Sequence, residues 1–188
     1  MDDYDKVLIH LRESFVFVAA VWYDKVKPNM NTLLRPFSDR MIQLDVQEVR
    51  WSHPQSGQDQ TSFVKVPLII ADAPARAKGQ NLLQFNGEYG CNTCEIKTVK
   101  TAAVPGLRRI RVYPYVQNPV LRTKAAMHNQ ATEAQRLGTI VKDVKGPSVL
   151  SLIPSVDISV CFIPEYMHGV LLGVEKHLLT IWSEVDEV

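Results

Sequence analysis

Three segments of the chain have the spacing or the composition of helices. In the first, apolar residues at helical spacing predict a helix that is capped by Asn29 or Asn31 and includes Met30, Leu33, Leu34, Phe37, Met41 and Leu44. Pro36 interrupts this pattern, so we expect a kink or a first helical turn near it. The segment 122–138 has helical composition and ends at Gly138. The segment 166–182 predicts a strongly apolar helix, one face of which carries Val170, Leu171, Val174, Leu178 and Trp182.

Continuous apolar runs predict buried strands at 14–23 and 63–70, and the second run ends at Ala71-Asp72. Between them, "WSHPQSGQDQ" has the composition of a loop. Pro74 suits the first turn of a helix that extends to about Phe85. Two later apolar segments, "SVLSLIP" and "VDISVCFIP", are strands or packed turns. The alternation of strands and helices predicts a mixed α/β core.

Composition places the chain among ordinary globular proteins, with 188 residues, 46% hydrophobic and 22% charged. The segment 95–146 is polar, basic and rich in proline, which indicates an insertion or a small subdomain. The N-terminus is acidic where a secretory signal would be basic, and no apolar run is long enough for a membrane helix. We therefore expect an intracellular protein with no membrane partner.

The net charge of +1 hides a local excess of positive charge. The stretch 97–124 has no Asp or Glu and contains Lys97, Lys100, Arg108, Arg109, Arg111, Arg122 and Lys124. A stretch of this kind is usually a solvated basic loop. Tyr113 and Tyr115 interleave with the cations, which favours a nucleic-acid surface over an anonymous one.

Asp72 directly follows an apolar strand, where two roles are open to a carboxylate. It suits the N-cap of the helix that begins near Pro74, and this reading is favoured on the local sequence. Carboxylates at strand ends are also natural metal ligands in α/β folds.

Cys91 and Cys94 have the spacing of a zinc knuckle, in which both thiolates bind one metal at about 2.3 Å. A thioredoxin-like redox pair is the rival, but it would place the first cysteine after a strand, and "NGEYG" is not one. Zinc is therefore favoured, with the other ligands drawn from His10, His53, His128, Cys161, His168 and His177. On one unbroken helix His168 and His177 lie about 13.5 Å apart, so at most one of them is a ligand.

Five stretches together resemble the CACTA (En/Spm-type) DDE transposases. They follow one another in the family's order: "ADAPARAKGQNLLQFNGEYGCNTC", "RVYPY", "RT" at Arg122-Thr123, "KGPSVLSLIP" and "PEYMHGVLLGVEKHLLTIW". The upstream stretch "VAAVWYDKVKPNMNTLLRPF" resembles the part of the family that precedes the second catalytic Asp. The resemblance covers most of the chain, from about Phe15 to Trp182.

The resemblance implies an α/β fold with an incomplete RNase H-like core and a zinc-binding insertion. The implied parts are a non-matching segment 1–14, a partial core 15–90, a basic zinc-binding insertion 91–160 and an apolar helix 161–188 that returns to the core. In the family, three acidic residues hold two divalent metals, usually Mg²⁺, for DNA strand cleavage and transfer. Asp72 matches the second acidic residue, which raises the ligand reading above the cap. Cys91 and Cys94 match the family's cysteine pair, His168 matches its "DYMH" histidine, and His128 fits more loosely as a fourth zinc ligand.

The chain also departs from the family. Asp2, Asp3 and Asp5 lack the strand and the following Gly of the first catalytic Asp, and Glu175, Glu184 and Glu187 lack the context of the final Glu. We therefore expect a fragment of a transposase catalytic domain that is inactive alone. The alternatives are a host-retained, catalytically dead domain that binds DNA or protein, and a zinc-stabilised interaction module. The resemblance also implies transposon-end DNA as a partner and a nuclear location, and it allows a homo-oligomer of the intact protein.

Overall fold

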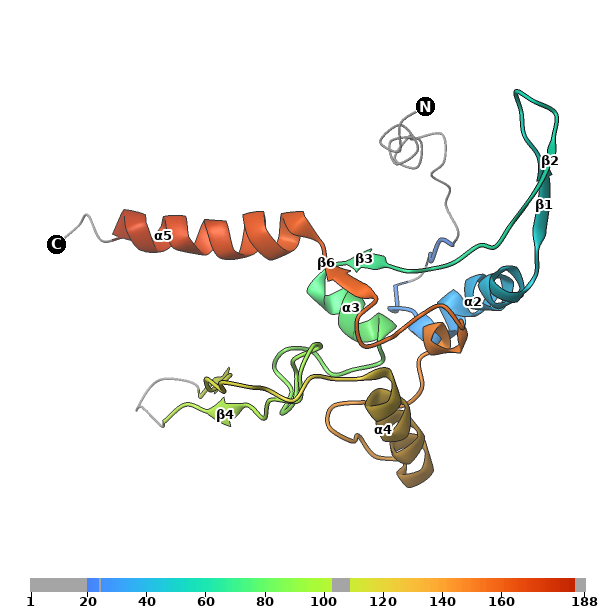
Figure 1. Ribbon diagram of the computed structural model, residues 1–188. Coiled ribbons are helices and arrows are strands. Elements are labelled where there is room, and N and C mark those ends of the chain that lie inside the picture. Colours follow the sequence, from blue (N-terminus) through green and yellow to red (C-terminus); the bar gives the residue numbers. More distant parts are fainter. Residues whose placement is uncertain (1–19, 24, 103–108, 185–188) are drawn as a thin grey trace.

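The computed structural model describes residues 20–23, 25–102 and 109–184 (Figure 1). Most of the strand expected at 14–23 lies outside these residues, and its described part, 20–23, is exposed and has no regular structure. The elements in chain order are α2 (Met30–Val46), β1 (Val49–Ser52), β2 (Asp59–Ser62), β3 (Ile69–Ala71), α3 (Ala73–Gly79), β4 (Val99–Lys100), β5 (Arg111–Val112), α4 (Lys124–Leu137), the 3-10 helix η2 (Val149–Leu152), β6 (Phe162–Pro164), the π-helical segment η3 (Met167–Glu175) and α5 (Lys176–Glu184).

Helix α2 begins where the sequence predicts. The side chain of Asn29 caps it by accepting from the backbone N–H groups of Asn31 and Thr32. Pro36 lies inside the helix and does not divide it. The helix packs against η2, and Asn31 joins the two by accepting from the N–H of Val149 at 2.9 Å. This packing offsets the local cost of the proline.

The segment expected to be a loop is the tip of a β-hairpin. Strands β1 and β2 pair antiparallel from Val49 opposite Ser62 to Ser52 opposite Asp59. The turn between them is closed by the carbonyl of His53, which accepts from the N–H of Gly57 at 2.8 Å. Gly57 has φ +68°, a backbone conformation that glycine adopts without strain. Residues 53–58 form the turn, and only the ends of the segment, Trp51-Ser52 and Asp59-Gln60, belong to the strands.

Strands β3 and β6 form a parallel pair in which Ala71 lies opposite Pro164. The expected strand 63–70 is thus limited to its last residues, and only Ile69–Ala71 pairs. Helix α3 is also shorter than predicted and ends at Gly79, not near Phe85. A Cβ added at Gly79 would lie 2.6 Å from Cζ of Phe162, so this glycine allows α3 to lie close to β6.

The core lies where α2, α4, η2 and the chain before β6 meet. Its buried members are Met41, Leu82, Met127, Ala131, Val144, Val149, Leu150, Ile153, Val156, Ile158, Cys161 and Phe162. A buried carboxylate anchors its edge: Asp45 accepts from Nζ of Lys65 and, at 2.6 Å, from the N–H of Ser155. These bonds hold the pKa of Asp45 at about 2, below its usual 3.8, because Lys65 and Ser155 favour the charged form.

The C-terminal helical segment extends away from the rest of the chain in Figure 1. It was expected to bury one apolar face, but its large apolar side chains are exposed on every side, among them Leu172 and Leu179 at 55% and Trp182 at 64%. No described helix has the length and apolarity needed to cross a membrane.

The described strands form three separate two-stranded sheets, which with the helices make a mixed α/β structure. The α/β class expected from the sequence is therefore present at this coarse level.

Candidate nucleic-acid interface and cysteine pair

Asp72 caps helix α3, as its local sequence predicts. Its Oδ1 accepts from the backbone N–H of Ala75 at 2.7 Å, and Pro74 lies in the first turn. The carboxylate that was also predicted to bind a catalytic metal is therefore engaged in a helix cap.

A second carboxylate, Glu165, lies beside Asp72 and was not singled out from the sequence. It directly follows β6 as Asp72 follows β3, and its backbone N–H donates to the carbonyl of Ala71 at 3.2 Å. Its side chain accepts from the N–H groups of Met167 and His168 at 2.7 and 2.8 Å, and its Oε2 lies 2.5 Å from Nδ1 of His168. These contacts, first of all those from His168, lower the pKa of Glu165. The sequence signal that could have identified Glu165 is its position directly before the apolar segment 166–182.

Cys91 and Cys94 lie close together in one turn of the chain. Sγ of Cys91 accepts from the N–H groups of Thr93 and Cys94, both at 3.4 Å. Burial would raise the pKa of Cys91, but the Thr93 amide, the thiol and amide of Cys94 and the Arg122 guanidinium together lower it. Burial and the neighbouring Cys91 raise the pKa of Cys94, which is only 7% exposed.

The cysteine pair fits two ligand positions of a zinc knuckle, but the predicted histidines do not complete the set. His128 is exposed on α4, and His168 is exposed and paired with Glu165. Within the described part of the chain, no three His, Cys, Asp or Glu side chains lie close enough to hold one metal ion. The structure thus brings together Cys91 and Cys94, and it does not bring His128 or His168 to them.

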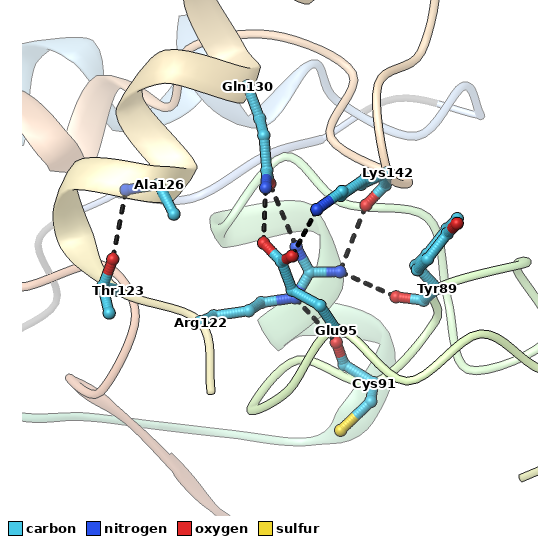
Figure 2. Close-up of polar contacts among 8 residues, drawn as sticks. All are labelled: Tyr89, Cys91, Glu95, Arg122, Thr123, Ala126, Gln130 and Lys142. Carbon is cyan, nitrogen blue, oxygen red and sulfur yellow. Dashed lines mark hydrogen bonds and ion pairs between the residues drawn. The ribbon is translucent and has the colours of Figure 1, made fainter. Parts of the chain in front are cut away.

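Arg122 ties the cysteine loop to helix α4 (Figure 2). Its guanidinium donates to the carbonyls of Cys91, Tyr89 and Lys142 at 2.9, 2.7 and 3.1 Å. Burial lowers its pKa, while the nearby Glu95 opposes this shift. Only 3% of Arg122 is exposed, so its cation holds three backbone segments together and is not available to phosphate. The DNA-contact role expected for Arg122 does not agree with this position.

Glu95 completes the polar cluster around Arg122. Its carboxylate accepts from Nε2 of Gln130 and from Nζ of Lys142, each at 2.5 Å, as Figure 2 shows. Gln130 belongs to α4, which begins at Lys124, two residues after Arg122, and is capped by the Thr123 hydroxyl. The loop 89–95 is therefore fixed to the start and the middle of one helix.

Two of the other predicted cations, Lys100 and Arg111, belong to a small β-ribbon, β4–β5, and Arg109 lies just before its second strand. The ribbon projects from the fold (Figure 1). Lys100 and Arg111 are directly opposite each other across the ribbon. Nη1 of Arg111 donates to Oγ1 of Thr98 at 3.0 Å, and the Thr98 hydroxyl donates in turn to the carbonyl of Gly87. Lys100 and Arg109 are exposed and have no carboxylate partner in the described residues.

Three more predicted cations differ in their surroundings. Nζ of Lys97 pairs with Glu88 at 2.7 Å, which raises the pKa of Lys97 and lowers that of Glu88. Lys124 is exposed and lies 3.4 Å from the carbonyl of Pro154. Arg108 lies outside the described residues.

Comparison with known proteins found no protein-family model, no curated protein and no solved structure that matches the chain.

Proposed function

We propose that this chain is the central part of a DDE transposase catalytic domain of the CACTA type, that it binds DNA, and that it is inactive in strand transfer by itself. The proposal includes an RNase H-like core. It also includes transposon-end DNA as the partner and the nucleus as the place of action. The sequence motifs support the family. The charge pattern of the β4–β5 ribbon supports DNA binding.

The facing cations of this ribbon are the observation that carries the proposal. Like charges directly across two strands destabilise a ribbon in water unless an anion lies between or beside them. Lys100 faces Arg111, the stretch 97–124 that contains both has no carboxylate, and Glu88, which lies near Arg111, is already paired with Lys97. A chain of phosphates satisfies such a pair, because it brings negative charge at regular intervals and releases counterions on binding. We define the basic arm as Lys100, Arg109 and Arg111.

The anchoring of the basic arm also favours binding. Arg111 is held by Thr98, which is bonded to the carbonyl of Gly87, while Arg122 fixes the neighbouring loop to α4. Cations on a fixed ribbon lose less conformational entropy on binding than cations on a mobile loop.

Zinc, in this proposal, binds through Cys91 and Cys94 and stabilises the loop at the base of the arm. Zinc in a structural site needs four ligands, and the two thiols supply two of them. When bound to the two cysteines as thiolates, it would add a cross-link to the loop.

A two-metal Mg²⁺ centre does not fit the described residues. Such a centre needs several carboxylates directed at one point, as in the three-acid set of the family. Asp72 and Glu165 share one end of the β3–β6 pair, but both carboxylates bond helix N–H groups, and the described residues contain no group of three ligands. We therefore derive no catalytic step for this chain.

The test is DNA binding by the full chain at several salt concentrations, measured by fluorescence anisotropy with a labelled duplex. We expect the affinity to fall steeply with salt, and the double variant Lys100→Ala/Arg109→Ala to reduce the slope of log K against log salt by about 1–2. The matched control Arg136→Ala/Lys145→Ala removes the same charge from exposed sites outside the arm. A flat salt response, or equal effects of the two double variants, contradicts DNA binding by the arm.

A second candidate is a host-retained, catalytically inactive domain that binds a protein. The exposed apolar segment η3–α5 favours it, since a helix that is apolar on all sides is normally covered. Genomic context separates the two: terminal inverted repeats and an upstream exon with an Asp-Gly strand indicate a mobile element, and their absence around a retained gene indicates a host function.

A further inference from the structure

Two tyrosines follow strand β5, and the structure gives them different roles. The hydroxyl of Tyr113 donates to the carbonyl of Phe85 at 2.6 Å, which fixes this ring against the fold. Tyr115 is 91% exposed, and no hydrogen bond or ring contact involves it within the described chain. Tyr113 is therefore an anchor, whereas the ring of Tyr115 is presented to solvent.

The position of Tyr115 is set by its neighbours. Pro114 has a fixed φ and disfavours helical backbone at Tyr113, and residues 113–116 have no regular secondary structure. Strand β5 ends at Val112, so Tyr115 lies three residues beyond the strand that carries Arg111. The exposed ring thus lies close in sequence to the cations of the arm.

An exposed aromatic ring beside unpaired cations suits one class of partner. A tyrosine ring left in water gives up the favourable free energy that its burial against another apolar surface would contribute. In single-stranded nucleic acid the bases have free faces that stack on such rings while phosphates contact the cations. In an intact duplex the base faces are already stacked on one another, so a ring outside the helix has only base edges and backbone to contact.

We propose that Tyr115 stacks on an unpaired base of single-stranded DNA whose phosphates are held by the basic arm. This rests on the proposed function, because the arm must first bind DNA. The chain should then prefer unpaired DNA strands, such as those at nicked or frayed ends, and this preference should depend on the side chain of Tyr115.

The experiment compares three labelled ligands with the full chain: an oligothymidine of about 15 nucleotides, an abasic strand of the same length, and a duplex. Stacking of one base predicts that Tyr115→Ala weakens oligothymidine binding about tenfold, and that Tyr115→Phe, which keeps the ring, restores it. Binding of the abasic strand should not change, because the phosphates are the same. Tyr23→Ala, which removes another fully exposed tyrosine, is the matched control and should have no effect.

Each failure has its own meaning. If Tyr115→Ala binds oligothymidine as the native chain does, or loses abasic and oligothymidine binding equally, the stacking inference is wrong while DNA binding stands. If the native chain binds none of the three ligands at low salt, the proposed function itself is wrong.

Discussion

Asp72 and Glu165 follow the last residues of two paired parallel strands, and each bonds the first N–H groups of the helix that begins there. Two carboxylates at the same end of a parallel pair are a common starting point for a metal site in α/β proteins. Here each has a helix to cap. The structural role is thus sufficient to explain both side chains in this chain.

Asp72 allows the cap and the metal role to be separated. Asp72→Ala should lower the free energy of unfolding by about 1 kcal/mol, while Asp72→Asn should cost only a few tenths, because Asn caps as well as Asp. Urea denaturation measures both. A stabilisation by Mg²⁺ that is present in the native chain and absent in Asp72→Asn would show instead that the carboxylate holds a metal.

Asp45 should make the stability of the chain depend on acid. Its folded pKa of about 2 lies below the model-peptide value of 3.8, so its contribution is fully present above about pH 4 and is lost as the pH falls toward 2. Thermal unfolding of the native chain and of Asp45→Asn from pH 2 to 7 checks this. The variant should be less stable at pH 7, and the difference should shrink below pH 4.

The control for this acid dependence is Asp39→Asn. Asp39 makes an exposed pair with Arg35 on the outer side of α2. The Asp39→Asn variant should leave the dependence of stability on pH almost unchanged, since exposed ion pairs contribute little to stability. If the stability difference between the native chain and Asp45→Asn is the same at every pH from 2 to 7, the acid dependence does not come from Asp45.

Arg122 should matter for stability more than for direct DNA contact. Arg122→Ala removes the donors to three carbonyls and leaves Lys142 as the one cation paired with Glu95 among the described residues, which should cost about 3 kcal/mol or more of unfolding free energy. Chemical denaturation measures this, and the exposed Lys124→Ala is the control, with a change near zero. A variant of Arg122 with native stability but a reduced salt slope for DNA would assign the side chain to phosphate contact.

The cysteine pair should bind zinc as a unit. We expect about one zinc per chain in protein purified without chelator, and we expect Cys91→Ser or Cys94→Ser to lose it together with stability. Cys161→Ala is the matched control, since this buried thiol belongs to the core. Metal analysis and thermal unfolding give the readouts. Zinc retained by Cys91→Ser, or no zinc in the native chain, would contradict the site.

Local signals predicted the elements that local chemistry controls. Helix α2 begins after Asn29 and helix α4 ends before Gly138, as expected, because a capping residue satisfies the free backbone groups at the end of its own helix. The hairpin β1–β2 was missed because β2 contains no apolar residue and β1 alternates apolar and polar residues over only four positions, which is too short to identify a strand. Helix α3 was drawn too long because its end depends on Gly79 meeting Phe162, a residue distant in the sequence.

The sequence identified several residues of the candidate site, but it did not predict which of them contact one another in the folded chain. Spacing alone paired Cys91 with Cys94, since residues three apart meet through the backbone of one turn. Composition placed Arg122 among the surface cations, because a sequence does not reveal which of several arginines finds buried carbonyl partners. Tyr113 and Tyr115 look equivalent in the sequence, and only the bond from Tyr113 to Phe85 separates them.

The exposed segment η3–α5 has a consequence for how the chain unfolds. Its helical hydrogen bonds are supported by few side-chain contacts outside the segment, so it should melt separately from the core. Its amide protons should then exchange with solvent far faster than those of α4, whose face is packed. The core should therefore unfold in a single cooperative transition. The segment η3–α5 should have a separate equilibrium between helix and coil until another surface packs against it.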